Sequence, residues 1–258
     1  LQKIGKESLL VLAGDIYQIE SIDFGNWFFY AKEILPQKED FQVEAGIYHS
    51  LFSTGSAMAM MSCLVDCGSV IFSRATNLLG QTAITAYTAG RRIMRIGISF
   101  LGNLAHSGSI YVGQNWGADK KDRIRQGTRN AIAIGFATSA VIGITVWILA
   151  EPMIRFFIPD GSFEAVRIGI QALRVQAVFL IFLYLLCEHR AAIQGMGNAI
   201  IPMCSGFLEL AVRIVYALTI PAWLGSGSLY FTDAITWIPT TLMLVICYHI
   251  RKNRLPSE

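Results

Sequence analysis

Charged side chains are scarce in this sequence. Lys, Arg, Asp and Glu together make up 15% of its 258 residues, whereas a typical soluble domain carries about 25%. The formal net charge is only +3. No run rich in Lys and Arg is interleaved with aromatic residues, so nucleic acid is not expected as a partner. This composition, together with a mean hydropathy of +0.49, favours a membrane protein.

The sequence also lacks the patterns that carry known chemistry. It contains no nucleophile–base arrangement, no zinc-type cysteine pair, no phosphate-binding glycine loop and no ATP-binding motif. Its cysteines lie in or beside apolar runs, where free cysteine packs as a small hydrophobic side chain. We therefore expect neither an enzyme nor a bound cofactor. We expect buried, unpaired thiols at Cys63, Cys67, Cys187, Cys204 and Cys247.

Long apolar runs dominate the rest of the chain. A helix needs about 20 apolar residues to cross a bilayer core of about 30 Å, and residues 131–150 form such a run without one charge. Only helices and closed barrels satisfy their backbones in lipid, and these runs are too long for barrel strands. The sequence predicts an all-α polytopic membrane protein with spans at 52–73, 82–112, 131–150, 166–187, 201–222 and 229–250.

Two features limit these spans. Pro152 is expected to end the third span after Glu151, because proline cannot continue a helix without losing a backbone hydrogen bond. Residues 1–44 contain an apolar stretch that acidic residues interrupt, and they fit no span. We expect an irregular N-terminal remnant and linker over 1–44, followed by one six-helix transmembrane lobe over 45–258.

Basic residues are concentrated in alternate loops. The segment 111–129, between the second and third spans, contains five of them, and the chain end after the sixth span contains Arg251, Lys252 and Arg254. The three intervening loops contain only Arg74 and Arg155. An excess of Lys and Arg marks the cytoplasmic side. The sequence therefore predicts a multi-pass protein of the cell (plasma) membrane with its C-terminus in the cytoplasm.

The segment 113–118, Gly-Gln-Asn-Trp-Gly-Ala, is followed by a basic stretch. It resembles a loop in the second half of the multidrug and toxic compound extrusion (MATE) family. Other stretches resemble the family in matching order: 68–71, 75–80 and 86–88 its seventh helix and the start of its eighth, 152–157 an external loop, and 190–198 the loop before its eleventh helix. Glu209 and Arg213 resemble the acidic and basic pair on that eleventh helix.

The resemblance implies a transporter with two pseudo-symmetric six-helix lobes. Such transporters export drugs and other amphipathic organic compounds by alternating access, against entry of Na⁺ or H⁺. This chain would supply helices seven to twelve, and its partners would be the lipid bilayer, small organic substrates and an N-terminal six-helix lobe. Two alternatives remain: a lipid-precursor flippase of related architecture, and a membrane fragment without transport activity.

Asp66 lies in the middle of the first span. A charged side chain at the bilayer centre costs about 2.5–3.5 kcal/mol on insertion scales, so it is expected to face protein or water. The carboxylate is a candidate site for the coupling ion or proton. The alternative is a hydrogen bond to a neighbouring helix. The family's better-known acidic sites lie at other positions, so the resemblance does not assign Asp66.

Basic residues within the spans are further candidates. Glu209 and Arg213 are four residues apart, which places them on one helix face in the favourable order. We expect a structural ion pair, with exchange of Glu209 onto a cationic substrate as the alternative. Arg91 and Arg95 share a face of the second span, and Arg92 points about 100° away. They either line a water-filled cavity that accepts anionic or zwitterionic substrates or pair with carboxylates.

Several polar residues lie near predicted span ends. Glu188, His189 and Arg190 are expected to anchor the cytoplasmic end of the fourth span, and Asp233 is expected to be solvated at an external helix end. Glycine permits close backbone approach and unwound turns. We therefore interpret two loop segments as hinges or gate latches, with simple loops as the alternative. Their residues are Gly113, Gln114, Asn115, Gly117, Gly195, Gly197 and Asn198.

Overall fold

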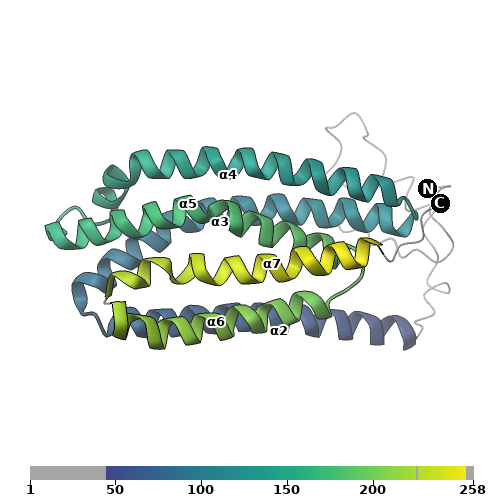
Figure 1. Cartoon of the computed structure of the whole chain (residues 1–258), viewed down its shortest axis with the longest axis horizontal. Helices are drawn as coiled ribbons and strands as arrows, with labels where there is room; N and C mark the ends of the chain where they lie inside the picture. The colour runs from purple at the N-terminus through teal and green to yellow at the C-terminus, as the bar shows by residue number, and fades with distance from the viewer. Residues whose placement is uncertain (1–44, 225, 254–258) are drawn as a thin grey trace, which may run out of the picture. The chain divides into compact units, whose positions relative to one another are not determined.

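The computed structural model describes residues 45–224 and 226–253, and almost all of them are helical (Figure 1). In chain order the elements are α2 (Ala45–Asn77), α3 (Gln81–Gly117), α4 (Lys121–Phe157), α5 (Phe163–Gly195), α6 (Ile200–Leu224), the short 3₁₀ helix η2 (Ser226–Phe231) and α7 (Thr232–Asn253). The predicted remnant and linker over 1–44 lies outside the described residues. From Leu51 onward the helices form one compact unit, Leu51–Glu258.

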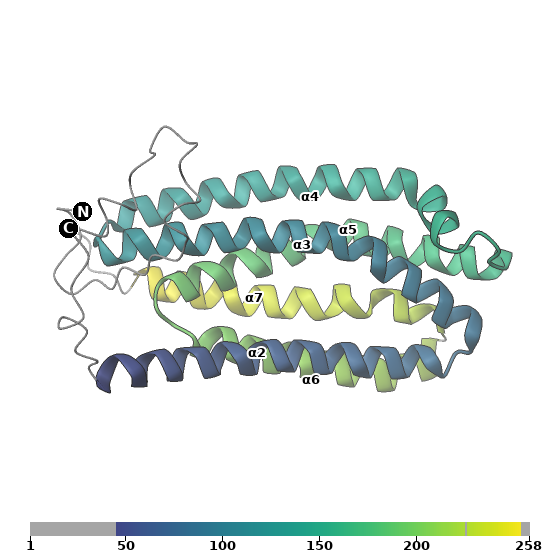
Figure 2. The ribbon, with the colours of Figure 1, turned by 180° about the vertical axis from the view of Figure 1, so that it is seen from behind.

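Within this unit, successive helices run antiparallel and are joined by short connections. α5 packs against α3, α4 and α7, and α7 also packs against α6. Seen from behind, α7 lies between the group α3–α4–α5 and the pair α2 and α6 (Figure 2). α5 and α7 are therefore the inner helices of the lobe, and their side chains form much of its interior.

Five helical segments are long and apolar enough to cross a membrane. They are Leu51–Asn77, Lys121–Phe157, Phe163–Gly195, Ile200–Pro221 and Gly227–Arg251. The prediction of an all-helical membrane protein is confirmed for these segments. α3 is long enough, with 37 residues, but it is not among them, because its arginines and many small polar residues lower its hydropathy. α3 instead packs closely against α4 and α5.

The segment 111–129 is not a loop, contrary to the prediction. α3 continues to Gly117 and α4 begins at Lys121, so the connection between them is only 118–120. Backbone hydrogen bonds close this connection: the amide of Ala118 donates to the carbonyl of Gln114, and the amide of Lys120 donates to the carbonyl of Asn115. Polar residues end an apolar run but not a helix, so both helices extend past the apolar residues that mark the span.

Two other helices are also longer than predicted. α4 continues through Pro152 to Phe157, because proline removes only one backbone donor while Ile154, in the next turn, is fully buried. α5 continues through the expected loop at His189 and Arg190 to Gly195. Glu188 and His189 are 0% and 4% exposed. They are packed inside the lobe, so the prediction that they anchor a helix end is wrong.

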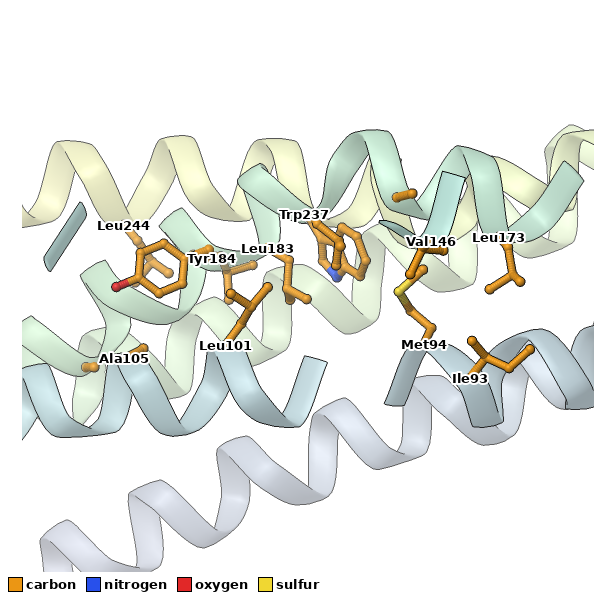
Figure 3. Close-up of a cluster of buried hydrophobic side chains, with 14 of the residues drawn as sticks. Ile93, Met94, Leu101, Ala105, Val146, Leu173, Leu183, Tyr184, Trp237 and Leu244 are labelled. Atoms are coloured by element: carbon orange, nitrogen blue, oxygen red, sulfur yellow. The ribbon is translucent and has the colours of Figure 1, made fainter. Parts of the chain in front are cut away.

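The main core lies between α3, α4, α5 and α7. Leu101 of α3, Tyr184 of α5 and Leu244 of α7 are completely buried and meet there (Figure 3). Because lipid tails are as apolar as these side chains, close van der Waals packing holds such helices together. Glycine permits the closest approach: at Gly143 of α4, a Cβ would lie 2.9 Å from the carbonyl oxygen of Ala177 on α5.

The cysteines are only partly as expected. All five are free thiols, but Cys63 and Cys67 of α2 and Cys204 of α6 are exposed, so the prediction of buried thiols is wrong for these three. α2 meets the other helices along a narrow strip, with only 11% of its most apolar window buried. An apolar sequence therefore does not imply a buried helix here, because most of α2 remains available to lipid or to another protein surface.

Candidate functional site

Arg213 of α6 lies at the centre of a buried group of charged side chains. Its Nη2 is 3.6 Å from Oε1 of Glu209 and 3.2 Å from Oδ1 of Asp233, at the start of α7. The side chains of Arg213 and Glu209 are 6% and 5% exposed. The ion pair expected from the four-residue spacing is therefore present. Asp233 is not solvated as predicted, because α7 begins close enough to α6 for its carboxylate to reach Arg213.

Two residues of α5 extend this group in both directions along the lobe. Arg190 Nη2 donates to Oε2 of Glu209 at 3.0 Å, and its Nε donates to the hydroxyl of Ser205 at 3.2 Å. Gln176 Nε2 donates to Oδ2 of Asp233 at 2.9 Å. The charge network is defined here as Gln176, Arg190, Glu209, Arg213 and Asp233. It connects α5, α6 and α7 by side-chain contacts.

α2 meets the charge network at Arg213. Nη1 of Arg213 donates a long hydrogen bond, 3.4 Å, to the backbone carbonyl of Val65. Gly68, one turn further along α2, makes room for the guanidinium, because a Cβ there would lie 2.7 Å from Nη1. Gly68 was noticed in the sequence only as part of the stretch 68–71. Its role depends on a partner far away in the chain, so no local pattern could have revealed it.

Asp66 does not join the charge network, although it follows Val65 directly. Its side chain is exposed, and it forms no ion pair or hydrogen bond with any residue that the structure describes. Ser62, Ser69 and Ser73 lie on the same face of α2 at helical spacing, and they range from half-buried to exposed. We call Ser62, Asp66, Ser69 and Ser73 the polar stripe of α2. The role of Asp66 stays a prediction.

The arginines of α3 are in different surroundings. The guanidinium of Arg91 is half-buried and lies 5.1 Å from the ring centroid of Phe72 on α2, and it interacts electrostatically with Asp233 and Arg213. Arg92 and Arg95 are exposed. Two surface hollows of about 410 Å³ and 350 Å³ are lined by other residues. Within the described chain, Arg91 thus borders the charge network, while Arg95 faces outward.

The hinge candidates divide into two kinds. Gly113, Gln114, Asn115 and Gly117 lie within α3, so the prediction of a loop there is wrong, while their role as a hinge or gate latch stays a prediction. The side-chain amide Nδ2 of Asn115 donates to the backbone carbonyl of Tyr111 at 2.8 Å, one turn earlier in the same helix. The carbonyl oxygen of Gly195 would lie 3.5 Å from a Cβ at Gly113. The glycine therefore serves close packing between α3 and α5.

The second kind lies at the turn between α5 and α6, where the prediction of a turn is correct. Gly197 has φ +73°, a conformation that glycine adopts without strain. Oδ1 of Asn198 accepts a hydrogen bond of 2.9 Å from the backbone amide of Ile201 in the first turn of α6. Gly195, at the end of α5, faces α3: a Cβ there would lie 2.6 Å from the carbonyl oxygen of Ser109.

Arg251 of α7 contacts both the end of α3 and the turn between α5 and α6. Its Nη2 donates to the carbonyl of Met196 at 2.9 Å, and its guanidinium lies 5.6 Å from the ring centroid of Trp116. Trp116 belongs to the segment 113–118, whose sequence resembles the MATE family loop. The ends of α3, α5 and α7 are therefore held together by one arginine.

The chain resembles known transporters in sequence and in fold. The MatE family model matches residues 57–219. A protein of Thermotoga maritima described as "Probable multidrug resistance protein NorM" is 20% identical over 184 residues, which cover 69% of this chain and 39% of that protein. The chain thus spans well under half the length of this curated relative.

Solved structures of similar fold match over about half of their own length. The structure of a mutant of the Vibrio cholerae MATE transporter VcmN gives a TM-score of 0.79 at 15% identity, covering 88% of this chain and 52% of that chain. A MATE structure in the bent conformation gives 0.77 at 17% identity, covering 84% and 48%. A MOP superfamily transporter from Pyrococcus furiosus gives 0.72 at 15% identity, covering 79% and 45%.

The family match covers more than half of the chain, and the fold matches at a high TM-score over most of it. The members of this family are transporters, not enzymes. The predicted resemblance is confirmed, and with it the helical membrane class: this chain belongs to the MatE family of multi-pass membrane transporters.

Proposed function

We propose that this chain forms one lobe of a gradient-driven antiporter that exports amphipathic organic compounds by alternating access. The other lobe would be a six-helix N-terminal partner. The family membership and the coverage of about half of the solved structures support this proposal. The basic residues near the α3–α4 connection and at the end of α7 lie at the same end of the unit (Figure 1). They support a C-terminus on the cytoplasmic side of the membrane, which we propose to be the plasma membrane.

The observation that carries the proposal is the exposed carboxylate of Asp66. It lies at the depth of the charge network, since the neighbouring Val65 contacts Arg213. A carboxylate at this depth is too costly to face lipid, so it faces water or another protein surface. The polar stripe of α2 then forms part of the wall of a transport path between two lobes. Asp66 is the residue there that binds the coupling cation, Na⁺ or H⁺.

The charge network has a different role in this proposal. Glu209 accepts from two arginines, and Asp233 accepts from Arg213 and Gln176. Both carboxylates are therefore already compensated, and exchanging one onto a cationic substrate would leave a buried arginine unpaired. We assign the network to holding α2, α5, α6 and α7 as one rigid body that moves during alternating access.

The exposed arginines Arg92 and Arg95 favour a second candidate, a flippase for anionic lipid precursors. Arginine is suited to phosphate groups because its planar guanidinium donates two parallel hydrogen bonds. The Pyrococcus furiosus transporter is described as having a binding pocket of reverse polarity, which suggests a different function for that protein. In this second candidate, the α3 arginines face the same path as Asp66 and bind the headgroup.

Transport by the assembled protein tests the proposal. The chain is co-expressed with an N-terminal six-helix lobe of the family and reconstituted in vesicles, and export of a fluorescent cation is measured under Na⁺ and H⁺ gradients. We expect gradient-driven export, and we expect Asp66→Asn to reduce it to the rate without a gradient. Asp160→Asn, in the exposed connection before α5, is the matched control and should transport normally.

The outcomes separate the candidates. An assembled pair that exports nothing, despite correct insertion, contradicts the antiporter and favours the inactive fragment. Transport of an anionic lipid analogue that is lost in Arg95→Gln but retained in Asp66→Asn favours the flippase. Normal export by Asp66→Asn, with unchanged ion dependence, overturns the assignment of Asp66.

A further inference from the structure

Glu188 is a buried carboxyl group outside the charge network. It lies on α5 and is 0% exposed, and it forms no ion pair with any residue in the ranges 45–224 and 226–253. Its Oε2 is 3.2 Å from the hydroxyl of Tyr184, one turn earlier. Its Oε1 has no hydrogen-bond partner within those ranges. An ionised carboxylate in such a place pays a large desolvation cost without compensation.

Counting hydrogen-bond donors indicates where a proton lies. The hydroxyl of Tyr184 contacts two acceptors, Oε2 of Glu188 and the backbone carbonyl of Ala131 on α4, which is 2.9 Å away. A phenol has one hydrogen to donate and a carbonyl has none. The shorter contact is to Ala131, so Tyr184 donates there. The 3.2 Å contact to Glu188 is then a hydrogen bond only if the carboxyl group itself is the donor.

The packing around Oε1 fits a neutral group. A Cβ at Gly108 of α3 would lie 2.9 Å from this oxygen, so a glycine backbone closes the site on that side. A carbonyl oxygen of a neutral carboxyl group tolerates the lack of a partner far better than an ionised oxygen does, because the cost of an unsatisfied group is larger when it is charged. One proton bound to Glu188 thus accounts for both the contact of Oε2 with Tyr184 and the lack of a hydrogen-bond partner at Oε1.

We infer that Glu188 is a proton-binding site in the core of the lobe, where its carboxyl group donates to Tyr184 and Tyr184 donates to Ala131. The site connects α5 to α4 and is closed by α3. It needs no transported substrate, so it stands whether or not the proposed antiport occurs.

The other titratable groups near the site do not supply a competing charge. Cys187 and His189 flank Glu188 on α5, and Tyr248 faces the site from α7. The His189 ring contacts the Leu185 carbonyl at 2.7 Å and packs against the ring of Tyr248, with 5.4 Å between the centroids. α3 contributes the backbone at Gly108, and α4 contributes the carbonyl of Ala131. Arg125 of α4 interacts with Tyr248 and forms its ion pair with Asp122 at 3.6 Å. Loss of the proton therefore leaves a bare carboxylate among neutral groups, and the Tyr184 hydroxyl then turns from Ala131 towards it. Proton release would weaken the contact between α4 and α5.

Infrared spectroscopy of the whole chain in lipid vesicles tests this inference. At neutral pH a glutamate in water is ionised, so we expect a carboxylic-acid carbonyl band that Glu188→Gln removes. Tyr184→Phe should shift the band, because it removes the acceptor of the carboxyl proton. Glu151→Gln, which changes an exposed carboxylate, should leave it unchanged. Replacing K⁺ by Na⁺ should also leave it unchanged.

Two results would overturn the inference. One is a wild-type spectrum at neutral pH without any carboxylic-acid band that responds to Glu188→Gln or Tyr184→Phe. The other is a band that disappears when Na⁺ is added, which would make Glu188 a sodium ligand. The wild-type spectrum and the Tyr184→Phe variant keep the test decisive even if Glu188→Gln does not fold.

The pH dependence of stability provides an independent measurement. The folded chain holds a proton that the unfolded chain releases at neutral pH, so wild-type stability should fall as pH rises. Glu188→Gln mimics the protonated group permanently, so its melting temperature should fall less than that of the wild type as the pH rises from about 4, where free glutamate begins to ionise, to neutral pH. Equal slopes for the two proteins would show that Glu188 binds no proton on folding.

Discussion

Arg213→Met should destabilise the lobe by about 3–5 kcal/mol, the range for removing one partner of a buried ion pair. The substitution keeps most of the side-chain volume but removes the charge that Glu209 and Asp233 share. Glu209 retains Arg190, whereas Asp233 retains only the neutral Gln176. Asp233 is thus left as a half-buried carboxylate without an ion-pair partner, with only the electrostatic influence of Arg91 nearby. The free energy of unfolding in detergent micelles is the measurement.

The chain contains a matched control for this variant. Arg155 pairs with Glu151 at the same four-residue spacing and at a shorter distance, 3.0 Å, but its side chain is 53% exposed. Exposed pairs contribute about 0–1 kcal/mol, so Arg155→Met should have little effect. Adding Asp233→Asn to Arg213→Met should recover part of the lost stability. Equal costs for the Arg155 and Arg213 variants would contradict the buried network.

Gly135→Ala should destabilise the lobe, although less than Arg213→Met does. An added Cβ on α4 would collide with the ring of Tyr184, which is completely buried and bonded to Ala131. Overpacking of this kind costs about 1–3 kcal/mol, and displacement of the ring also loses a hydrogen bond worth about 1 kcal/mol. The gain in helix propensity from replacing glycine, about 1 kcal/mol, offsets only part of this.

Gly102→Ala supplies the comparison for the same chemical change. Gly102 also lies within a helix, α3, but no atom lies within 4 Å of an added Cβ there. Its substitution should therefore be neutral or stabilising by up to about 1 kcal/mol. Melting temperatures of the two variants in the same detergent measure the difference. The packing described for Tyr184 is incorrect if Gly135→Ala melts as high as Gly102→Ala.

The sequence predicts the helix interiors better than the helix ends. An apolar run such as 131–150 must be helical to cross lipid, so its class follows from composition alone. The ends do not follow, because α3 and α4 extend as polar helices beyond the apolar residues. α3 is long enough to span a membrane, but polar residues such as Arg92 and Arg95, which are exposed in this lobe, lower its hydropathy. Whether such residues face lipid, water or another protein surface is a tertiary property that hydropathy along the chain does not measure.

The candidate site shows the same division between local and distant contacts. The Glu209–Arg213 pair follows from a spacing of four residues. Arg190 and Asp233 meet that pair across sequence separations of 19 and 20 residues, and Gln176 reaches Asp233 across 57 residues. Their partners depend on which helices are neighbours, and a single sequence does not contain that information. Asp233 was therefore misread as solvated, and Glu188 was overlooked as a buried group.

The central claim is that the polar stripe of α2 faces an aqueous path and not lipid, and native cysteines allow a direct measurement. Cys63 is exposed and lies three residues from Asp66, on the adjoining part of the helix face. Cys204 is equally exposed on α6 but shares its face with Phe207, Val215 and Leu218, which are exposed apolar residues. Single-cysteine variants that retain only one of these thiols differ in their surroundings but not in their chemistry.

When the chain is assembled with the proposed N-terminal lobe in vesicles, a membrane-impermeant maleimide should label Cys63 and leave Cys204 unlabelled. A lipid-soluble maleimide should label both and so establish that both thiols are reactive. The account is contradicted if the impermeant reagent spares Cys63 as completely as Cys204 while the lipid-soluble reagent labels both.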